Sequence, residues 1–226
     1  MAKKKKKKRV FKIKNICIIL SILIGIGFLS YYLVTMPIKN IYINGNKLIT
    51  DDEIIESANL YEYPSFLLTN KNKLIKAIKK NKYIKTVNIE KKLGNILEIT
   101  IKEYKTISLN KDGNIIQENN QILENTYNQT DIPILINDIS NSNIQVNFTK
   151  QFSKINLNIL RQISEIEYSP IEVDENRFIL YMNDRNIVHI TLPKIEKLNK
   201  YNQIKDVLEG KTGIIYLDSG NYVEIK

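Results

Sequence analysis

The sequence has few of the residues on which much protein chemistry depends. Its 226 residues include one cysteine, Cys17, and one histidine, His189. A single cysteine cannot form a disulfide within the chain or a cysteine-rich metal site, and a single histidine cannot supply the several imidazoles of common zinc sites. These absences exclude a disulfide scaffold and the usual multi-histidine metalloenzymes. We expect no metal and no cofactor.

Acidic residues are missing from the first 14 positions, which hold nine of the 34 lysines and arginines. The remainder has 25 basic residues against 24 acidic ones, so the formal net charge of +10 belongs to the N-terminal tail. A domain that binds nucleic acid carries its basic residues on the folded part. The charge distribution therefore argues against a nucleic-acid-binding domain.

One long run, Ile16 to Val34, has no charged residue. A helix of this length covers about 28 Å, close to the ~30 Å hydrocarbon core of a bilayer. The run is longer than the apolar part of a signal peptide, and no small-residue cleavage motif follows it. We predict a tail over residues 1–15 that stays in the cytoplasm by the positive-inside rule, an uncleaved transmembrane helix over 16–35, and an extracytoplasmic remainder.

Residues 37–104 show the order strand, helix, helix, strand, strand. The run Thr50-Asp51-Asp52-Glu53 is a capping box, and Thr69 or Asn70 can cap the second helix. Alternating apolar residues then mark the strands. We predict one small core between two helices and a three-stranded sheet, formed by Ile41, Ile43, Ile54, Ile78, Val87, Ile99 and Ile101.

Residues 105–226 are richer in predicted strands. Hairpins are predicted at Lys111-Asp112-Gly113, at residues 183–186 and at residues 218–221, each between runs with alternating apolar residues. The last hairpin joins Gly213–Leu217 to Tyr222–Ile225. We therefore expect a mostly antiparallel β domain.

Two segments between these strands have apolar residues at helical spacing. Apolar residues from Phe152 to Ile166 recur at helical intervals, and a second series begins at Pro193 and ends before Gly210. The polar segment 137–149 is interpreted as a surface connection. The fold class expected for the whole chain is α+β, with one transmembrane helix.

Four motifs follow one another behind the single hydrophobic run. They are I-Y-I-N-G-N-K (41–47), K-Y-I-K-T-V-N-I (82–89), L-E-I-T-I-K-E (97–103) and G-I-I-Y-L-D-S-G-N-Y-V-E-I (213–225). In this order the chain resembles the bacterial cell-division family FtsQ, called DivIB in Gram-positive bacteria. It departs from the family at Leu93-Gly94-Asn95, where relatives have a Pro-Asn turn. The resemblance implies a POTRA-type domain over 37–104 and a C-terminal β domain over 105–226.

The resemblance also implies a function. Members of the family are non-catalytic scaffolds at the division septum, which bind the single-pass proteins FtsL and FtsB/DivIC and the septal transpeptidase machinery. Two alternatives stay open: another POTRA-bearing envelope protein of sporulation or secretion, and an anchored enzyme that processes the cell wall.

Two short motifs bear on the enzyme alternative. Ser108 and Lys111 form an S-x-x-K, and residues 211–213 form a K-T-G, as in penicillin-interacting enzymes. In those enzymes the serine opens a helix, whereas here the four residues run from a predicted strand into a turn. His189 is interpreted as a solvent-facing residue of a strand. We therefore expect no catalytic residue.

A protein without catalysis can act by offering a strand edge, where unpaired backbone groups accept a further strand. The chain stops directly after its last predicted strand, so we expect an open edge there. The alternative is an edge that only completes the protein's own sheet. The resemblance, rather than spacing, implies the partner-binding residues Leu217, Ser219, Gly220, Tyr222, Val223 and Ile225.

Overall fold

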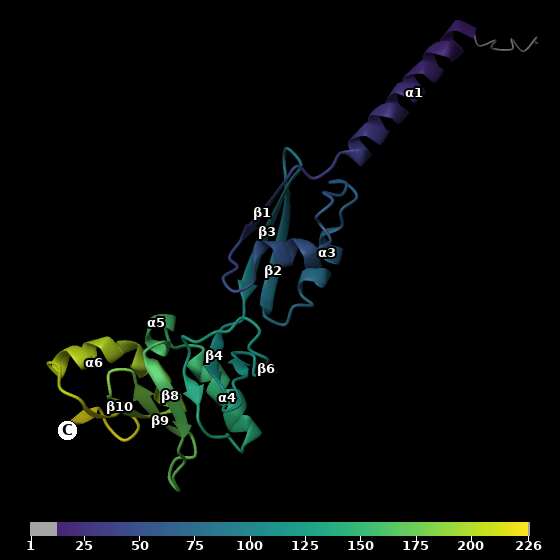
Figure 1. Ribbon diagram of the computed structural model, residues 1–226. Helices are drawn as coiled ribbons and strands as arrows, with labels where there is room; N and C mark the ends of the chain where they lie inside the picture. The colour runs from purple at the N-terminus through teal and green to yellow at the C-terminus, as the bar shows by residue number, and fades with distance from the viewer. Residues whose placement is uncertain (1–12, 226) are drawn as a thin grey trace, which may run out of the picture. The chain divides into compact units, whose positions relative to one another are not determined.

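The computed structural model describes residues 13–225, which divide into two compact units between Glu103 and Tyr104 (Figure 1). Most of the basic tail, from Lys3 to Lys12, lies outside the described residues, as does Lys226. The first unit begins with helix α1 (Ile13–Thr35), which has no buried residue. Within residues 13–225, α1 is the one helix that is long and apolar enough to cross a membrane.

The first unit continues with the predicted order of elements. These are β1 (Asn40–Asn44), α2 (Asp51–Ser57), α3 (Lys71–Ile78), β2 (Ile84–Lys92) and β3 (Ile96–Glu103). The sheet order is β1-β3-β2, with β1 parallel to β3 and β2 antiparallel to it. The central strand of the sheet is thus the last one in sequence.

Side-chain N-caps stabilise the first turns of both α2 and α3. The side chain of Thr50 accepts from the backbone N–H of Glu53, whose carboxylate accepts from the N–H of Thr50 in return. Asn70, one of the two predicted caps, accepts from the first turn of α3. Both caps satisfy N–H groups that have no partner inside the helix. The predicted capping box is confirmed.

The core of the first unit contains most of the residues predicted for it. Ile54, Ile78, Ile99 and Ile101 are at most 3% exposed. The other three, Ile41, Ile43 and Val87, are half-buried. They lie on β1 and β2, which are the two outer strands, so fewer neighbours cover them than cover β3.

The second unit is built on a nine-stranded sheet. Its order is β12-β11-β10-β9-β8-β7-β4-β5-β6, and three neighbouring pairs, β10–β11, β7–β8 and β4–β7, are parallel. The other pairs are antiparallel, as expected for most of this domain. The strands are β4 (Thr106–Leu109), β5 (Ile115–Gln117), β6 (Ile122–Leu123), β7 (Ile134–Leu135), β8 (Ile163–Tyr168), β9 (Arg177–Met182), β10 (Ile187–Thr191), β11 (Gly213–Tyr216) and β12 (Tyr222–Ile225).

Two interpretations of helical segments in this unit are wrong. Residues 137–149 are not a surface connection, because α4 (Ser142–Phe152) begins within them and buries Ile144 and Phe148. Its buried apolar residues lie four positions apart among mostly polar ones, so the segment has the composition of a surface connection. The predicted helix over 152–166 does not form. That stretch holds the end of α4, the short α5 (Leu157–Leu160) and strand β8.

A helical crossover joins β10 to its parallel neighbour β11. It consists of the 3₁₀-helix η1 (Leu192–Lys200) followed by α6 (Tyr201–Val207). The buried residues Ile195, Leu198 and Tyr201 recur every third position, which matches the three residues per turn of a 3₁₀-helix. Parallel strands require such a crossover. It leaves α6 near the last hairpin.

The core of the second unit lies between the sheet and its helices. Phe148 and Phe152 of α4 pack on Phe178 of β9, with ring centroids 5.3 Å and 5.9 Å away. Tyr168 of β8 joins them at 5.2 Å from Phe178. Aromatic side chains therefore fix α4 to the centre of the sheet.

Candidate strand-addition site

Strand β12 lies at one end of the nine-stranded sheet. Within residues 13–225 it pairs with β11 alone, in the register Ile214↔Glu224 and Tyr216↔Tyr222. Figure 1 shows this strand, in yellow, at the C-terminal end of the second unit. Its outer edge carries main-chain groups that a further strand can bind.

The backbone of β11 determines which groups of β12 face outward. The N–H groups of Gly213 and Leu217 donate toward β10, to Asn186 Oδ1 (2.9 Å) and to the carbonyl of His189 (2.8 Å). Backbone groups alternate in direction along a strand, so the N–H and C=O groups of Ile214 and Tyr216 point toward β12.

Glu224 and Tyr222 of β12 pair with Ile214 and Tyr216, so their N–H and C=O groups point back toward β11. The N–H and C=O groups of Val223 and Ile225 face the open edge.

An apolar groove of about 610 Å³ runs beside this edge. One wall is α6, with Ile204 and Val207, followed by Leu208, and the other side is β12, with Val223 and Ile225. Val207 is 81% exposed and Ile225 is 55% exposed, so water covers much of this apolar surface. A strand added to β12 would direct alternate side chains into the groove.

The groove brings three of the residues implied by the resemblance into one place. Val223 and Ile225 line its side, while Leu217 is only 4% exposed and contributes to its floor.

The other three lie elsewhere on the hairpin. Tyr222 is on the opposite face, where its ring stacks on Tyr216 with centroids 4.6 Å apart. Ser219 and Gly220 form the turn, and a Cβ on Gly220 would come within 2.9 Å of the Tyr222 ring. The six residues thus divide between groove, turn and far face.

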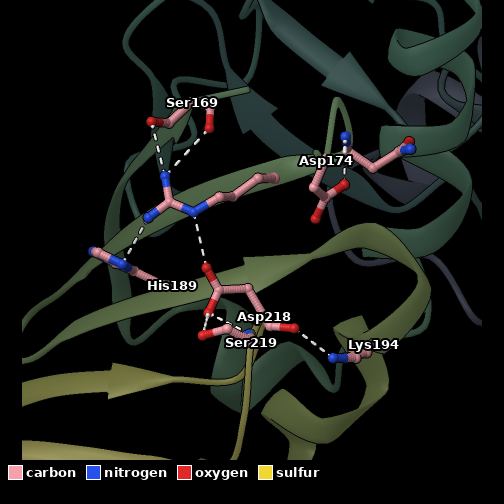
Figure 2. Close-up of polar contacts among 8 residues, drawn as sticks. Ser169, Asp174, His189, Lys194, Asp218 and Ser219 are labelled. Atoms are coloured by element: carbon pink, nitrogen blue, oxygen red, sulfur yellow. Dashed lines mark hydrogen bonds and ion pairs between the residues drawn. The ribbon is translucent and has the colours of Figure 1, made fainter. Parts of the chain in front are cut away.

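A largely buried cation, Arg177, holds the turn that precedes β12. Arg177 Nε donates to Asp218 Oδ2 at 2.8 Å, and the two side chains are 13% and 10% exposed. The same guanidinium donates to the hydroxyl of Ser169 (3.2 Å) and contacts His189 Nδ1 (2.7 Å). Figure 2 shows Ser169, His189 and Asp218 gathered around it. The cluster connects β9, β10 and the hairpin.

Two ionisable groups of this cluster have shifted pKa values. Burial alone would raise the pKa of Asp218, but hydrogen bonds from Arg177 and Ser219 outweigh it and lower that pKa. Burial, followed by the charge of Arg177, lowers the pKa of His189. A neutral imidazole can accept at Nδ1 from the guanidinium, which the protonated ring cannot do. His189 is thus a half-buried partner of Arg177, and its interpretation as a solvent-facing residue is wrong.

The crossover is fixed to the hairpin by a second polar network. Tyr201 is fully buried, and its hydroxyl donates to Asp184 Oδ1 at 2.7 Å. The side chain of Asn186 donates to that hydroxyl at 3.0 Å and accepts from the N–H of Gly213 at 2.9 Å. The network therefore holds the start of α6 close to β11.

The residues of the possible enzyme motif do not form a site. Ser108 is fully buried within β4, whereas Lys111 lies in the following turn and pairs with Asp138 at 2.5 Å. A nucleophile needs an adjacent base and access for substrate. Within the part of the chain that the structure describes, no three histidine, cysteine, aspartate or glutamate side chains are placed to hold a metal.

Comparison with known protein families first identifies the domain that the first unit contains. The family described as "POTRA domain, FtsQ-type" matches residues 36–104. The chain is therefore a POTRA-bearing protein with an N-terminal apolar helix and a mostly β second unit.

Similarity over most of the chain then gives the family. "Cell division protein DivIB" of Bacillus subtilis (strain 168) is 34% identical over 194 residues, which cover 83% of this chain and 73% of that one. The protein of the same name from Bacillus anthracis is 30% identical over 227 residues, 97% of this chain and 86% of that one. The chain belongs to the DivIB family of cell division proteins.

One solved structure matches part of this chain. It is the major extracytoplasmic domain of the trans isomer of DivIB from Geobacillus stearothermophilus, 25% identical, with a TM-score of 0.39. It covers 47% of this chain and 95% of that one.

Proposed function

We propose that this protein is a non-catalytic scaffold of the bacterial division complex, and that it binds its partners by strand addition along β12. The observation that carries the proposal is the open edge of β12, where Val223 and Ile225 present outward backbone groups beside an apolar groove. An added strand gains main-chain hydrogen bonds at the edge and burial in the groove.

The groove also defines the chemistry of the partner segment. It should be extended, with apolar side chains at alternate positions that enter the groove against Ile204 and Val207. Each side chain fully buried there contributes about 1.5–3 kcal/mol. Lys197 and Lys200 also line the groove, so an acidic residue at the end of the segment fits them. We expect single-pass division proteins of the FtsL and FtsB/DivIC kind, and with them the septal transpeptidase machinery, as partners.

Membrane anchorage supports this mode of binding. We propose that α1 crosses the membrane with the basic tail in the cytoplasm and both units outside, at the division septum. Anchored partners then search a layer rather than a volume, which raises their effective concentration without further contacts. Protease added to intact protoplasts should digest the chain after residue 36 and spare the tail. A protected large fragment would contradict this orientation.

The absence of catalysis is part of the proposal. Ser108 is shielded from substrate, and His189 is held by Arg177. Ser108→Ala should therefore leave division intact in cells whose only copy carries the change. Loss of division with the protein still folded and present in normal amount would instead favour the wall-processing enzyme.

Deletion of residues 221–226 tests the binding site directly. The full chain and the shortened chain are each used to capture partners from detergent-solubilised membranes, and mass spectrometry identifies what is bound. Other single-pass division proteins should be captured by the full chain and lost from the shortened one. Equal capture by both would contradict strand addition at β12 and favour the POTRA-type unit as the binding surface.

A further inference from the structure

Two loops of the first unit expose leucines beside the end of α1. Leu67 and Leu68 precede α3, and Leu93 lies in the turn between β2 and β3. Their exposed fractions are 54%, 71% and 97%. Exposed aliphatic side chains that form one patch mark an interaction surface more often than single exposed residues do.

The first loop is hydrogen-bonded to the chain that leaves α1. The N–H of Phe66 donates to the carbonyl of Met36 at 2.9 Å, and the N–H of Ile38 donates to the carbonyl of Pro64 at 3.0 Å. The hydroxyl of Ser65 donates to the carbonyl of Val34, within the last turn of α1. Leu67 and Leu68 directly follow these residues. The loop is therefore tied to the end of the apolar helix.

The second loop is tied to the same segment. The N–H of Lys39 donates to the carbonyl of Asn95 at 2.9 Å, and the Asn95 side chain donates to the carbonyl of Pro37 at 3.1 Å. Gly94 and Asn95 have φ angles of +84° and +59°, which make a tight turn with Leu93 at its start. Leu93 is thus held two residues from a backbone contact with the end of the span.

Lys91 joins the two loops. Its ammonium group donates to the carbonyls of Phe66 and Leu67, and it lies 5.1 Å from the centre of the Phe66 ring. The three leucines therefore belong to one supported surface rather than to independent loops.

We propose that this surface, Leu67, Leu68 and Leu93, inserts into the outer interface of the membrane that α1 crosses. The proposal rests on the membrane anchorage proposed above. The headgroup region adds roughly 5–8 Å on each side of the hydrocarbon core. Both loops bond to residues 34–39, directly where the apolar helix ends, so the leucines lie within reach of this layer. A lipid surface is therefore the occupant that the position of the leucines favours.

Membrane contact at two loops would restrain the first unit. Hydrogen bonds already hold the two loops to the end of α1, and three inserted side chains would add points of attachment to the bilayer itself. The contact would hold β1, β2 and β3 at a defined height above the bilayer.

The sequence contains no tryptophan, so an introduced one is a unique optical probe. Leu68→Trp and Leu93→Trp place it on the proposed surface. Lys102→Trp is the control: Lys102 is exposed and lies six residues along β3 from Ile96, or about 20 Å at ~3.3 Å per residue. Position 93 is the second probe if replacement of Leu68 disturbs the fold, because Leu93 is almost fully exposed.

Each full-length variant is reconstituted into phosphatidylglycerol-containing vesicles, with and without bromine on the acyl chains near the headgroups. The emission of the tryptophans at 68 and 93 should be shifted to shorter wavelength and should lose most of its intensity with brominated lipid. The tryptophan at 102 should show neither change.

Flotation of the same vesicles separates the two proposals. Protein that floats with the vesicles while all three tryptophans stay unquenched overturns lipid contact, leaves anchorage intact and favours a protein partner on this surface. Protein that does not float overturns both.

Discussion

Arg177 and Asp218 form a nearly buried ion pair, 2.8 Å between Nε and Oδ2, that ties strand β9 to the turn before β12. The pair joins residues 41 positions apart and places the end of the sheet at which we propose strand addition. The geometry of the proposed edge therefore depends on a contact that is not itself part of the edge.

Removal of this contact should loosen the hairpin. Asp218→Ala leaves the Arg177 guanidinium largely buried without its carboxylate, and we expect a loss of about 3 kcal/mol in the free energy of unfolding. Hydrogen exchange of the full chain should accelerate in residues 213–225. The matched control is Glu196→Ala, which breaks an exposed ion pair with Lys154 worth about 0–1 kcal/mol. Equal effects of the two changes would contradict the anchoring role of Arg177.

Acid should weaken the second unit through His189. Its folded-state pKa is lowered below the ordinary value of 6.5 by burial and by Arg177, opposed by Asp218 and Glu167. The unfolded chain therefore binds the proton more tightly. The free energy of unfolding should be constant above about pH 6.5 and fall as the pH drops below it.

A histidine variant isolates this effect. The pKa of Asp218 is also lowered, so its contribution is present above its ordinary pKa of about 4 and is lost only at more acidic pH. Between about pH 6.5 and 4.5, urea unfolding of His189→Gln should therefore show a smaller pH dependence than the parent chain. An unchanged slope would mean that another group is responsible.

The tyrosine in the crossover should be sensitive to loss of its hydroxyl. Tyr201→Phe removes the group that bonds Asp184 and Asn186 inside the protein, and buried groups left unpaired cost about 1–3 kcal/mol. Urea unfolding followed by circular dichroism measures this cost. Tyr42→Phe is the control, because Tyr42 is 54% exposed and its change should be close to zero.

The core of the first unit provides a separate test. Ile99 is fully buried on the central strand β3, so Ile99→Ala should lower the free energy of unfolding by about 2–5 kcal/mol. Leu93→Ala, at a position 97% exposed, should change it little. Thermal unfolding of both full-length variants measures the difference. Equal transition temperatures would show that Ile99 does not contribute to the core.

The elements that the sequence predicts well are those with local causes. Thr50 and Glu53 begin α2 through contacts within one turn, and the alternation in β9 and β10 reflects one buried face. The helix at 142–152 was not predicted because its buried apolar residues, Ile144, Phe148 and Phe152, are separated by mostly polar residues. The apolar residues from Phe152 to Ile166 gave a wrong prediction of one helix. Their helical spacing continues by chance across the end of α4, the short α5 and strand β8.

The candidate site could be predicted only in part. The final hairpin follows from its alternation and its turn. Which backbone groups of Val223 face outward depends on the parallel pairing of β10 with β11, and that pairing depends on the whole crossover. The contact between Arg177 and Asp218 joins distant segments and has no local pattern. The groove likewise exists only once α6 lies beside β12.

Proline at Val223 would block strand addition along β12 at a single backbone donor. Val223 N–H faces the open edge, so Val223→Pro should remove a donor for the partner while the hairpin keeps its own bonds through Tyr222 and Glu224. The control is Tyr222→Ala, which truncates a side chain on the far face and leaves every backbone donor in place.

The measurement is capture of single-pass division proteins by each full-length variant, with hydrogen exchange of residues 213–225 as the check on folding. Strand addition predicts that Val223→Pro loses the partners with β11 still protected, whereas Tyr222→Ala retains them. Full capture by Val223→Pro would contradict pairing along the edge of β12.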